Sequence, residues 1–272
     1  MSTFSRLVRF LARDGRTRRG RASSRGRLRR APRHGPGRRH PAAAPPLAPS
    51  DVGTVRCLGL NYADHARETG MAQPKFPILF YKPATALAGP SDAIPVHAMA
   101  QEGEGLDYEC ELVVVISKRC TDVPESEALD CVLGYAVGND VSHRDWQIKH
   151  GGSQWSHGKG FDGWAPYGPA IVSGRVVQDP EKLKIWTKVN GETRQDGSTS
   201  EMIFGIRKTI ALLSRGVTLM PGDLIFTGTP PGVGMGHKPP VWLKDGDVVE
   251  VGLEQVGTCT NKVEFASPKS KI

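Results

Sequence analysis

Three acidic residues in the middle of the chain have the spacing of a shared metal site. Glu109 and Glu111 lie at the start of a short apolar, β-branched run, residues 112–116, which is typical of a buried strand rather than a helix. Side chains two positions apart on a strand point to the same face, with their Cα atoms roughly 7 Å apart along the backbone. Asp140 follows a second apolar run, 132–137, where loops commonly build sites at strand ends.

Three carboxylates without histidine or cysteine would form an all-oxygen site. Such a site suits Mg²⁺, Mn²⁺ or Ca²⁺ better than zinc or copper. The alternative is a solvated strand edge with two ordinary acids, in which Asp140 is a turn residue. The spacing of the acids alone does not decide between these interpretations, so the residues around them matter.

A histidine and a glutamate occur together on a short predicted helix, residues 61–68. His65 and Glu68 are three positions apart, so they share one helix face. A histidine oriented by a carboxylate can act as a general base. The same spacing is also common in ordinary surface pairs.

The chain has 272 residues, which allows one large domain with a sizeable core or two small ones. Its five cysteines are odd in number and include no C-x-x-C pair, which indicates free thiols in a reducing compartment. No apolar run approaches the roughly 18 residues that a membrane span needs. We therefore expect a cytoplasmic protein without membrane contact, with mitochondria as the alternative location.

Positive charge is concentrated in the first fifty residues, which contain fourteen arginines and a single acid, Asp14. The remaining residues carry 22 basic and 27 acidic side chains, so that part of the chain is mildly acidic. The overall net charge of +8 is therefore no evidence for specific nucleic-acid binding.

Residues 20–50 contain neither aromatic nor β-branched side chains, so this stretch cannot bury enough surface to fold alone. We expect residues 1–50 to be a disordered tail and residues 51–272 to form the folded domain. The tail has three interpretations: a mitochondrial targeting segment, a nonspecific basic arm, or, slightly favoured, a mispredicted exon or shifted reading frame.

The rest of the chain predicts mostly short strands with few helices. Residues 52–60, 183–189 and 224–226 have strand-like composition, and Asn190-Gly191 is a hairpin signal. Residues 200–214 have apolar side chains at helical spacing.

Several motifs in order and at matching spacing resemble the fumarylacetoacetate hydrolase family, especially its eukaryotic domain-containing-protein-2 type. The resemblance runs from about residue 51 to residue 265. The motifs that carry it include C-L-G-L-N-Y-A-D-H-A-R-E (57–68), D-Y-E-C-E-L-V-V-V-I (107–116), N-D-V-S-H-R-D-W-Q (139–147), G-K-G-F-D (158–162) and P-G-D-L-I-F-T-G-T-P-P-G-V-G (221–234).

The resemblance implies an α+β, mostly β fold: a mixed β-roll or β-sandwich of the fumarylacetoacetase C-terminal type, with a few short helices. It also implies a homodimer and one Mg²⁺ or Mn²⁺ ion on Glu109, Glu111 and Asp140. The family's other active positions match six residues of this chain: His65 and Glu68 as a paired base, Lys159 as the active-site lysine, and Arg144, Gln147 and Thr229 as substrate contacts.

The expected reaction is metal-dependent hydrolysis of a C–C bond in an acylpyruvate or related β-diketo acid. A divalent ion that chelates a 1,3-dicarbonyl stabilises the enolate that forms when the bond breaks. Two alternatives remain: tautomerisation or decarboxylation of oxaloacetate through a similar enolate, or an inactive remnant with a damaged amino-terminal region. The partner in either enzymatic case is a small 2-oxo or β-diketo acid.

Overall fold

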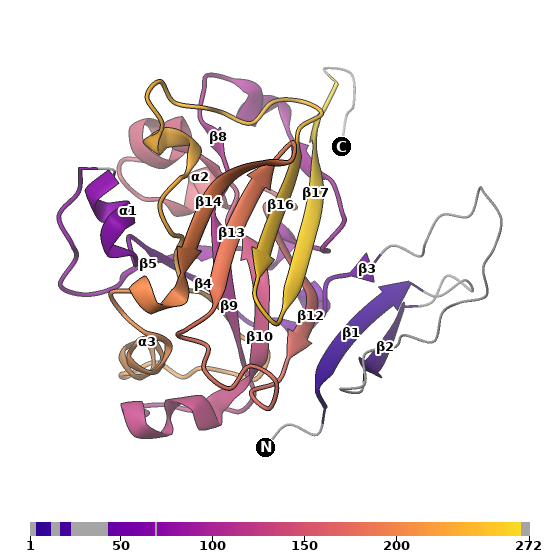
Figure 1. The fold of residues 1–272 in the computed structure, drawn as a ribbon, viewed down its shortest axis with the longest axis vertical. Helices are drawn as coiled ribbons and strands as arrows, with labels where there is room; N and C mark the ends of the chain where they lie inside the picture. The colour runs from indigo at the N-terminus through magenta and orange to yellow at the C-terminus, as the bar shows by residue number, and fades with distance from the viewer. Residues whose placement is uncertain (1–3, 12–16, 23–42, 69, 268–272) are drawn as a thin grey trace.

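The computed structural model describes residues 4–11, 17–22, 43–68 and 70–267. Strands dominate this part of the chain, as the sequence predicts (Figure 1). The strands are β1 (Arg6–Leu11), β2 (Thr17–Ala22), β3 (Ala43–Ala44), β4 (Val55–Gly59), β5 (Ile78–Lys82), β6 (Leu87–Ala88), β7 (Ile94–Val96), β8 (Leu106–Asp107), β9 (Cys110–Ile116), β10 (Val132–Asn139), β11 (Ser142–His143), β12 (Ala165–Val172), β13 (Lys184–Val189), β14 (Glu192–Ser198), β15 (Leu224–Phe226), β16 (Val248–Leu253) and β17 (Gly257–Phe265).

The helices are short. The α-helices are α1 (Ala63–Glu68), α2 (Ser156–Lys159) and α3 (Ile206–Leu213), and η5 (Asp145–His150) is a π-helix. The 3₁₀ helices are η1 (Pro49–Asp51), η2 (Ala84–Ala86), η3 (Ala98–Gln101), η4 (Glu125–Cys131), η6 (Thr199–Glu201) and η7 (Gly234–Gly236). Among the described residues, no helix combines the length and apolar composition needed to cross a membrane.

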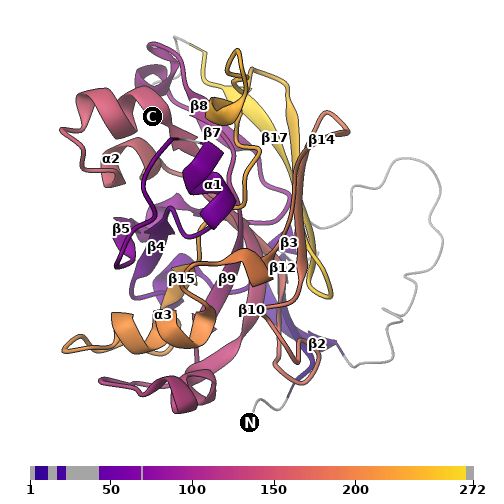
Figure 2. The same ribbon diagram turned by 60° about the vertical axis from the view of Figure 1, so that its left-hand side comes forward.

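Two sheets stack on each other and form the body of the molecule. The larger, mixed sheet has the strand order β2-β1-β12-β10-β9-β15-β4-β5, and the smaller has the order β14-β13-β16-β17-β7. The smaller sheet covers one face of β9 and β10, and the three α-helices lie on the side away from it (Figures 1 and 2). This arrangement confirms the predicted mixed, mostly β fold.

The alternation of side chains along β9 determines where its acids point. Cys110, Leu112 and Val114 pack into the core between the sheets, whereas Val113 and Val115 pack into a second core on the other face. Glu109 and Glu111 have the same parity as Val113, so they lie on the face that the helices cover.

The predicted helix over residues 200–214 is only partly correct. The structure has the 3₁₀ turn η6 first, and α3 begins at Ile206 because Gly205 has an extended backbone. The side chain of Asn61 accepts a hydrogen bond from the backbone nitrogen of Phe204 at 2.8 Å and donates to its carbonyl at 3.0 Å. A contact from a distant segment thus holds these residues outside the helix.

The described part of the first fifty residues differs from the expected disordered tail. Strand β1 pairs with β12, and the guanidinium of Arg6 donates hydrogen bonds to the carbonyls of Gln255 and Val256. Leu47 is buried in the second core. The composition argument covered residues 20–50 and therefore did not include β1, which contains the strand-favouring residues Val8 and Phe10. Residues 23–42 of the expected tail lie outside the described residues.

Candidate active site

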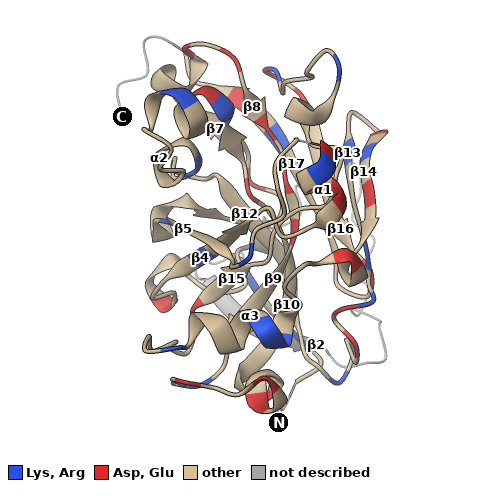
Figure 3. Cartoon of the chain, turned by 90° about the vertical axis from the view of Figure 1, so that its left-hand side faces the viewer, with Lys and Arg blue, Asp and Glu red and all other residues tan. Residues whose placement is uncertain are grey.

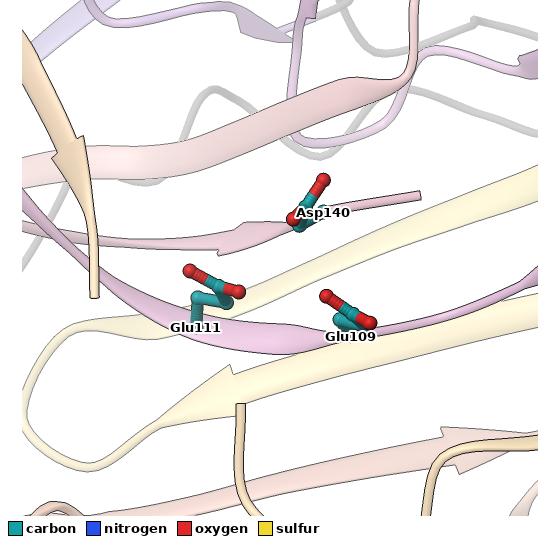
Figure 4. A group of neighbouring side chains, drawn as sticks. All are labelled: Glu109, Glu111 and Asp140. Carbon is teal, nitrogen blue, oxygen red and sulfur yellow. The ribbon is translucent and has the colours of Figure 1, made fainter. Parts of the chain in front are cut away.

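The three predicted metal ligands form one buried cluster. Ligand oxygens of Glu109, Glu111 and Asp140 all lie within 4.8 Å of one another (Figure 4). Two of the acids come from β9 and its start, and Asp140 follows the end of the neighbouring strand β10. The antiparallel register brings them together, because the backbone nitrogen of Asp140 donates to the carbonyl of Glu109 at 2.9 Å.

Buried cations surround this cluster. The Lys159 ammonium, at the end of α2, lies 2.8 Å from both Glu109 Oε2 and Asp140 Oδ2. Lys82 Nζ lies 2.7 Å from the other Asp140 oxygen. Burial opposes ionisation of Glu109, but the charges of Lys159 and Arg144 outweigh it and lower the pKa of this carboxyl.

Glu111 is the acid that the described residues leave incompletely paired. Its Oε2 accepts a hydrogen bond from the backbone nitrogen of Gly228 at 2.7 Å, whereas its buried Oε1 has no hydrogen-bond partner. Burial, together with the charges of Asp140 and Glu109, raises the pKa of Glu111 well above its ordinary value. A divalent cation would supply the missing positive charge.

The charge balance and the donor set also fit such an ion. Counting Asp107, which pairs with Arg144, the described cluster contains four carboxylates against three cations, Lys82, Arg144 and Lys159. The three clustered acids offer oxygen donors alone, which Mg²⁺ and Mn²⁺ prefer. The site therefore has the composition of a hard divalent-metal site.

Arg144 is engaged by acids of the protein. Its Nη1 lies 2.7 Å from Glu109 Oε1, and its Nε donates to Asp107 Oδ2 at 2.8 Å. Burial opposes its charge, yet Asp107 and Glu109 outweigh burial and raise the pKa of the guanidinium. Arg144 was predicted as a substrate contact, and this role stays a prediction; in the structure its guanidinium contacts Glu109 and Asp107.

The histidine and glutamate of α1 form the pair that their spacing predicts. His65 Nδ1 lies 3.2 Å from Glu68 Oε2. The Glu68 carboxylate also accepts a hydrogen bond from the backbone nitrogen of Gly232 at 3.0 Å, which ties α1 to the loop after β15. Because His65 is buried, the pair is not an ordinary surface contact.

The two remaining predicted substrate contacts are also hydrogen-bonded within the protein. The hydroxyl of Thr229 donates to the carbonyl of Cys110 at 2.9 Å and accepts from Gln195 Nε2 at 2.8 Å. Gln147 Oε1 accepts from Arg144 Nη1 at 2.9 Å. Both side chains are therefore held in one orientation.

A cavity of about 220 Å³ opens above the acid cluster. Of the nine residues predicted for the site, six line this cavity: His65, Glu109, Arg144, Gln147, Lys159 and Thr229. The other three lie outside the lining, Glu111 and Asp140 within the acid cluster and Glu68 beside His65. The structure thus brings all nine into one connected site, and their catalytic and binding roles remain proposals.

Three buried residues of the site were missed in the sequence. Lys82 pairs with Asp140, Asp107 pairs with Arg144, and Gln195 binds Thr229. Asp107 stands two positions before Glu109, so its strand parity could have suggested it. Lys82 and Gln195 lie in unremarkable sequence and had no comparable signal.

Comparison with known proteins agrees with this architecture. Residues 54–264 match the family model described as fumarylacetoacetate (FAA) hydrolase C-terminal. The chain is 48% identical over 228 residues to the fumarylacetoacetate hydrolase domain-containing protein 2 homolog of Dictyostelium discoideum, covering 80% of this chain and 73% of that protein.

Two solved structures show the same similarity. A fumarylacetoacetate hydrolase from the psychrophile Exiguobacterium antarcticum is 37% identical, with a TM-score of 0.82 over 96% of this chain and 99% of that chain. The 5-carboxymethyl-2-hydroxymuconate delta-isomerase of Mycobacterium smegmatis is also 37% identical, with a TM-score of 0.76 over 96% of this chain and 100% of that chain. The chain therefore belongs to the fumarylacetoacetate hydrolase family.

Proposed function

We propose that this protein is a metal-dependent hydrolase that cleaves a C–C bond in an acylpyruvate or related β-diketo acid. The observation that carries the proposal is the joint presence, in one cavity, of a buried acid cluster and the His65–Glu68 pair. The acid cluster fits Mg²⁺ or Mn²⁺, and the pair fits a general base. Hydrolysis requires both kinds of group.

The residues have distinct roles in this reaction. A divalent ion bound by Glu109, Glu111 and Asp140 would supply a Lewis acid for the substrate's carbonyl oxygens. His65, oriented by Glu68, takes a proton from water as the water oxygen bonds to the acyl carbonyl carbon. The C–C bond to the pyruvate methylene then breaks, and that carbon receives a proton. The products are pyruvate and a carboxylic acid.

Lys159 is, beside Arg144, a buried cation of the cavity lining. As a compact point charge, its ammonium can stabilise negative charge on the substrate's oxygens. Thr229 and Gln147, held by the contacts described above, border the space next to it. We assign these two residues to substrate orientation.

Tautomerisation or decarboxylation of oxaloacetate is the alternative function. Family members differ in reaction, since one similar structure is named as a hydrolase and another as an isomerase. Enolate chemistry needs the acid cluster but no water-activating base, so the pairing of the buried His65 with Glu68 favours hydrolysis. The complete cluster argues against an inactive remnant.

The remaining assignments follow the sequence. We propose a homodimer that acts on a small-molecule acid, without specific nucleic-acid binding. Basic and acidic positions are interspersed among the described residues on the face that carries α1 (Figure 3). The described cysteines are all free, which is consistent with a reducing compartment and a cytoplasmic location, with mitochondria as the alternative.

The test is a direct assay of both reactions. Purified protein with Mg²⁺ is incubated separately with acetylpyruvate and with oxaloacetate, and substrate loss and products are followed together. Hydrolysis predicts equal amounts of pyruvate and acetate from acetylpyruvate. Turnover of oxaloacetate without any cleavage of acylpyruvates would favour the alternative function.

A further inference from the structure

The cavity above the acid cluster has a charged floor and an apolar mouth. Its charged lining residues Lys159, Arg144 and Glu109 are all buried. Its exposed lining is mostly apolar: Met71 is 40% exposed and Ile148 is 46% exposed. A substrate therefore meets charge at its inner end and hydrocarbon at its outer end.

The side chain of Trp155 forms a fixed part of the apolar wall. Its ring lies against Gly59, where an added Cβ would overlap it. The ring centroid of Phe80 lies 5.8 Å away, and Phe80 belongs to the second core. Leu58 and Leu60, on either side of Gly59, line the same cavity and are buried. This wall cannot withdraw without disturbing the sheet.

No free cation stands at the mouth among the described lining residues. The lining groups that carry or can take a positive charge are Lys159, Arg144 and His65, and all three are buried. Four further groups that are or can become cationic lie near the mouth residues in sequence, Arg67, Lys75, Lys149 and His150, and none of them lines the cavity. Lys149 pairs with Asp145 at 2.7 Å, and Arg67 pairs with Asp64. A negative charge at the outer end of a substrate would therefore find no cationic partner among the described lining residues of the mouth.

We propose that the cavity selects acylpyruvates whose acyl group ends in an apolar group, and rejects those that end in a second carboxylate. This inference rests on the proposed function and specifies its substrate class. Moving an apolar terminus from water into contact with Trp155, Leu58 and Ile148 makes the free energy of binding more favourable. A terminal carboxylate would lose hydration without gaining a counter-ion, which discriminates against it.

A matched pair of substrates tests the proposal. Butanoylpyruvate and succinylpyruvate have acyl groups of equal carbon number and differ only in a terminal methyl or carboxylate. With Mg²⁺-loaded protein, we expect kcat/KM for butanoylpyruvate to exceed that for succinylpyruvate by about 100-fold. Titration calorimetry of both compounds should give the same order of affinities.

A charge placed at the mouth should reverse part of this preference. Ile148→Lys adds a cation at an exposed lining position, so we expect the ratio between the substrates to fall by about fivefold. Val217→Lys is the matched control, because Val217 is also apolar and β-branched, is 47% exposed and does not line the cavity. In this variant, the ratio of kcat/KM for butanoylpyruvate to that for succinylpyruvate should equal the ratio in the unaltered protein.

The two hypotheses fail in different ways. Equal or better cleavage of succinylpyruvate would overturn the selectivity while leaving C–C hydrolysis intact. Absence of cleavage of both compounds would overturn the proposed hydrolysis. In that case the calorimetric affinities still decide the selectivity: equal affinities, or binding of neither compound, would refute it.

Discussion

The buried carboxylate of Asp107 holds one edge of the guanidinium of Arg144 through two of its nitrogens. Arg144 Nε donates to Asp107 Oδ2 at 2.8 Å, and Nη2 lies 2.7 Å from the same oxygen. Asp107 also accepts hydrogen bonds from the backbone nitrogens of Gly234 and Met235 at 2.6 and 3.1 Å. Since Arg144 in turn pairs with Glu109, Asp107 connects the loop after β15 to one of the proposed metal ligands.

The first prediction concerns this connection. Asp107→Asn leaves the buried charge of Arg144 with one acid instead of two, so the free energy of unfolding should fall by about 3 kcal/mol. Arg144 would no longer be held in place beside Glu109. Mn²⁺ affinity should therefore fall by roughly tenfold, as it does when other residues that orient metal ligands are changed. Chemical denaturation and titration calorimetry measure the two effects.

A second buried pair supplies the control for Asp107→Asn. Asp223 binds Arg56 at 2.6 Å and two backbone nitrogens, those of Thr54 and Met220, but none of these residues lines the cavity. Asp223→Asn should destabilise the protein similarly without changing Mn²⁺ affinity. If both variants weaken Mn²⁺ binding equally, Asp107 has only a structural role.

The second prediction concerns the metal. EDTA should abolish activity, and Mg²⁺ or Mn²⁺ should restore it. Glu111→Gln should weaken Mn²⁺ binding by on the order of 100-fold or more, because it removes one charged ligand. The same change should raise the melting temperature of metal-free protein, since it removes a buried acidic group that lies beside the charges of Asp140 and Glu109. Full activity after metal removal would refute the assignment.

Metal affinity should also depend on pH in a defined direction. Burial and the neighbouring acids Asp140 and Glu109 raise the pKa of Glu111, so its proton competes with metal at higher pH than for an ordinary carboxyl. Mn²⁺ affinity should therefore rise with increasing pH until Glu111 is ionised, and fall on acidification through that raised pKa. Calorimetric titration at several pH values measures this, and an affinity independent of pH up to neutrality would contradict it.

The third prediction separates the two enzymatic reactions through Glu68. Glu68→Gln removes the charge that orients His65, so acylpyruvate cleavage should fall by on the order of 10² to 10⁴. Keto–enol exchange of oxaloacetate should retain a larger fraction of its rate, because it needs no activated water. Asp64→Asn, at an exposed position of the same helix, is the control. Equal, small losses in both reactions would show that the pair has been misassigned.

The fourth prediction concerns the first strands. Two shortened chains both lose β1: one begins at Pro49 and also loses Leu47, and the other begins at Ala43 and keeps it. The backbone nitrogen of Leu47 donates a hydrogen bond to the Tyr167 hydroxyl at 3.0 Å. Both should retain kcat, since these residues do not line the cavity. The free energy of unfolding should be about 2 kcal/mol lower for the chain that begins at Pro49 than for the one that begins at Ala43, which is the approximate value of burying one leucine. Equal denaturation midpoints would refute this role for Leu47.

Local periodicity in the sequence determined much of the site. Strand alternation placed Glu109 and Glu111 on one face, and helical spacing placed His65 beside Glu68. Both predictions depend only on backbone geometry within a few residues. The family motifs then indicated the mixed, mostly β fold and the Asp140 and Lys159 positions, and the structure has that fold.

Only the tertiary structure determined which charged side chains of the site pair with one another. Lys82 reaches Asp140 across 58 positions of sequence, and Arg144 reaches Asp107 across 37, so no local pattern reports either pair. The same holds for the edge pairing of β1 with β12, which joins Arg6 to the distant residue Val172. Pairing of buried charges depends on three-dimensional proximity in a low-dielectric interior, and strand pairing depends on an available edge. Neither quantity is a property of a short stretch of sequence.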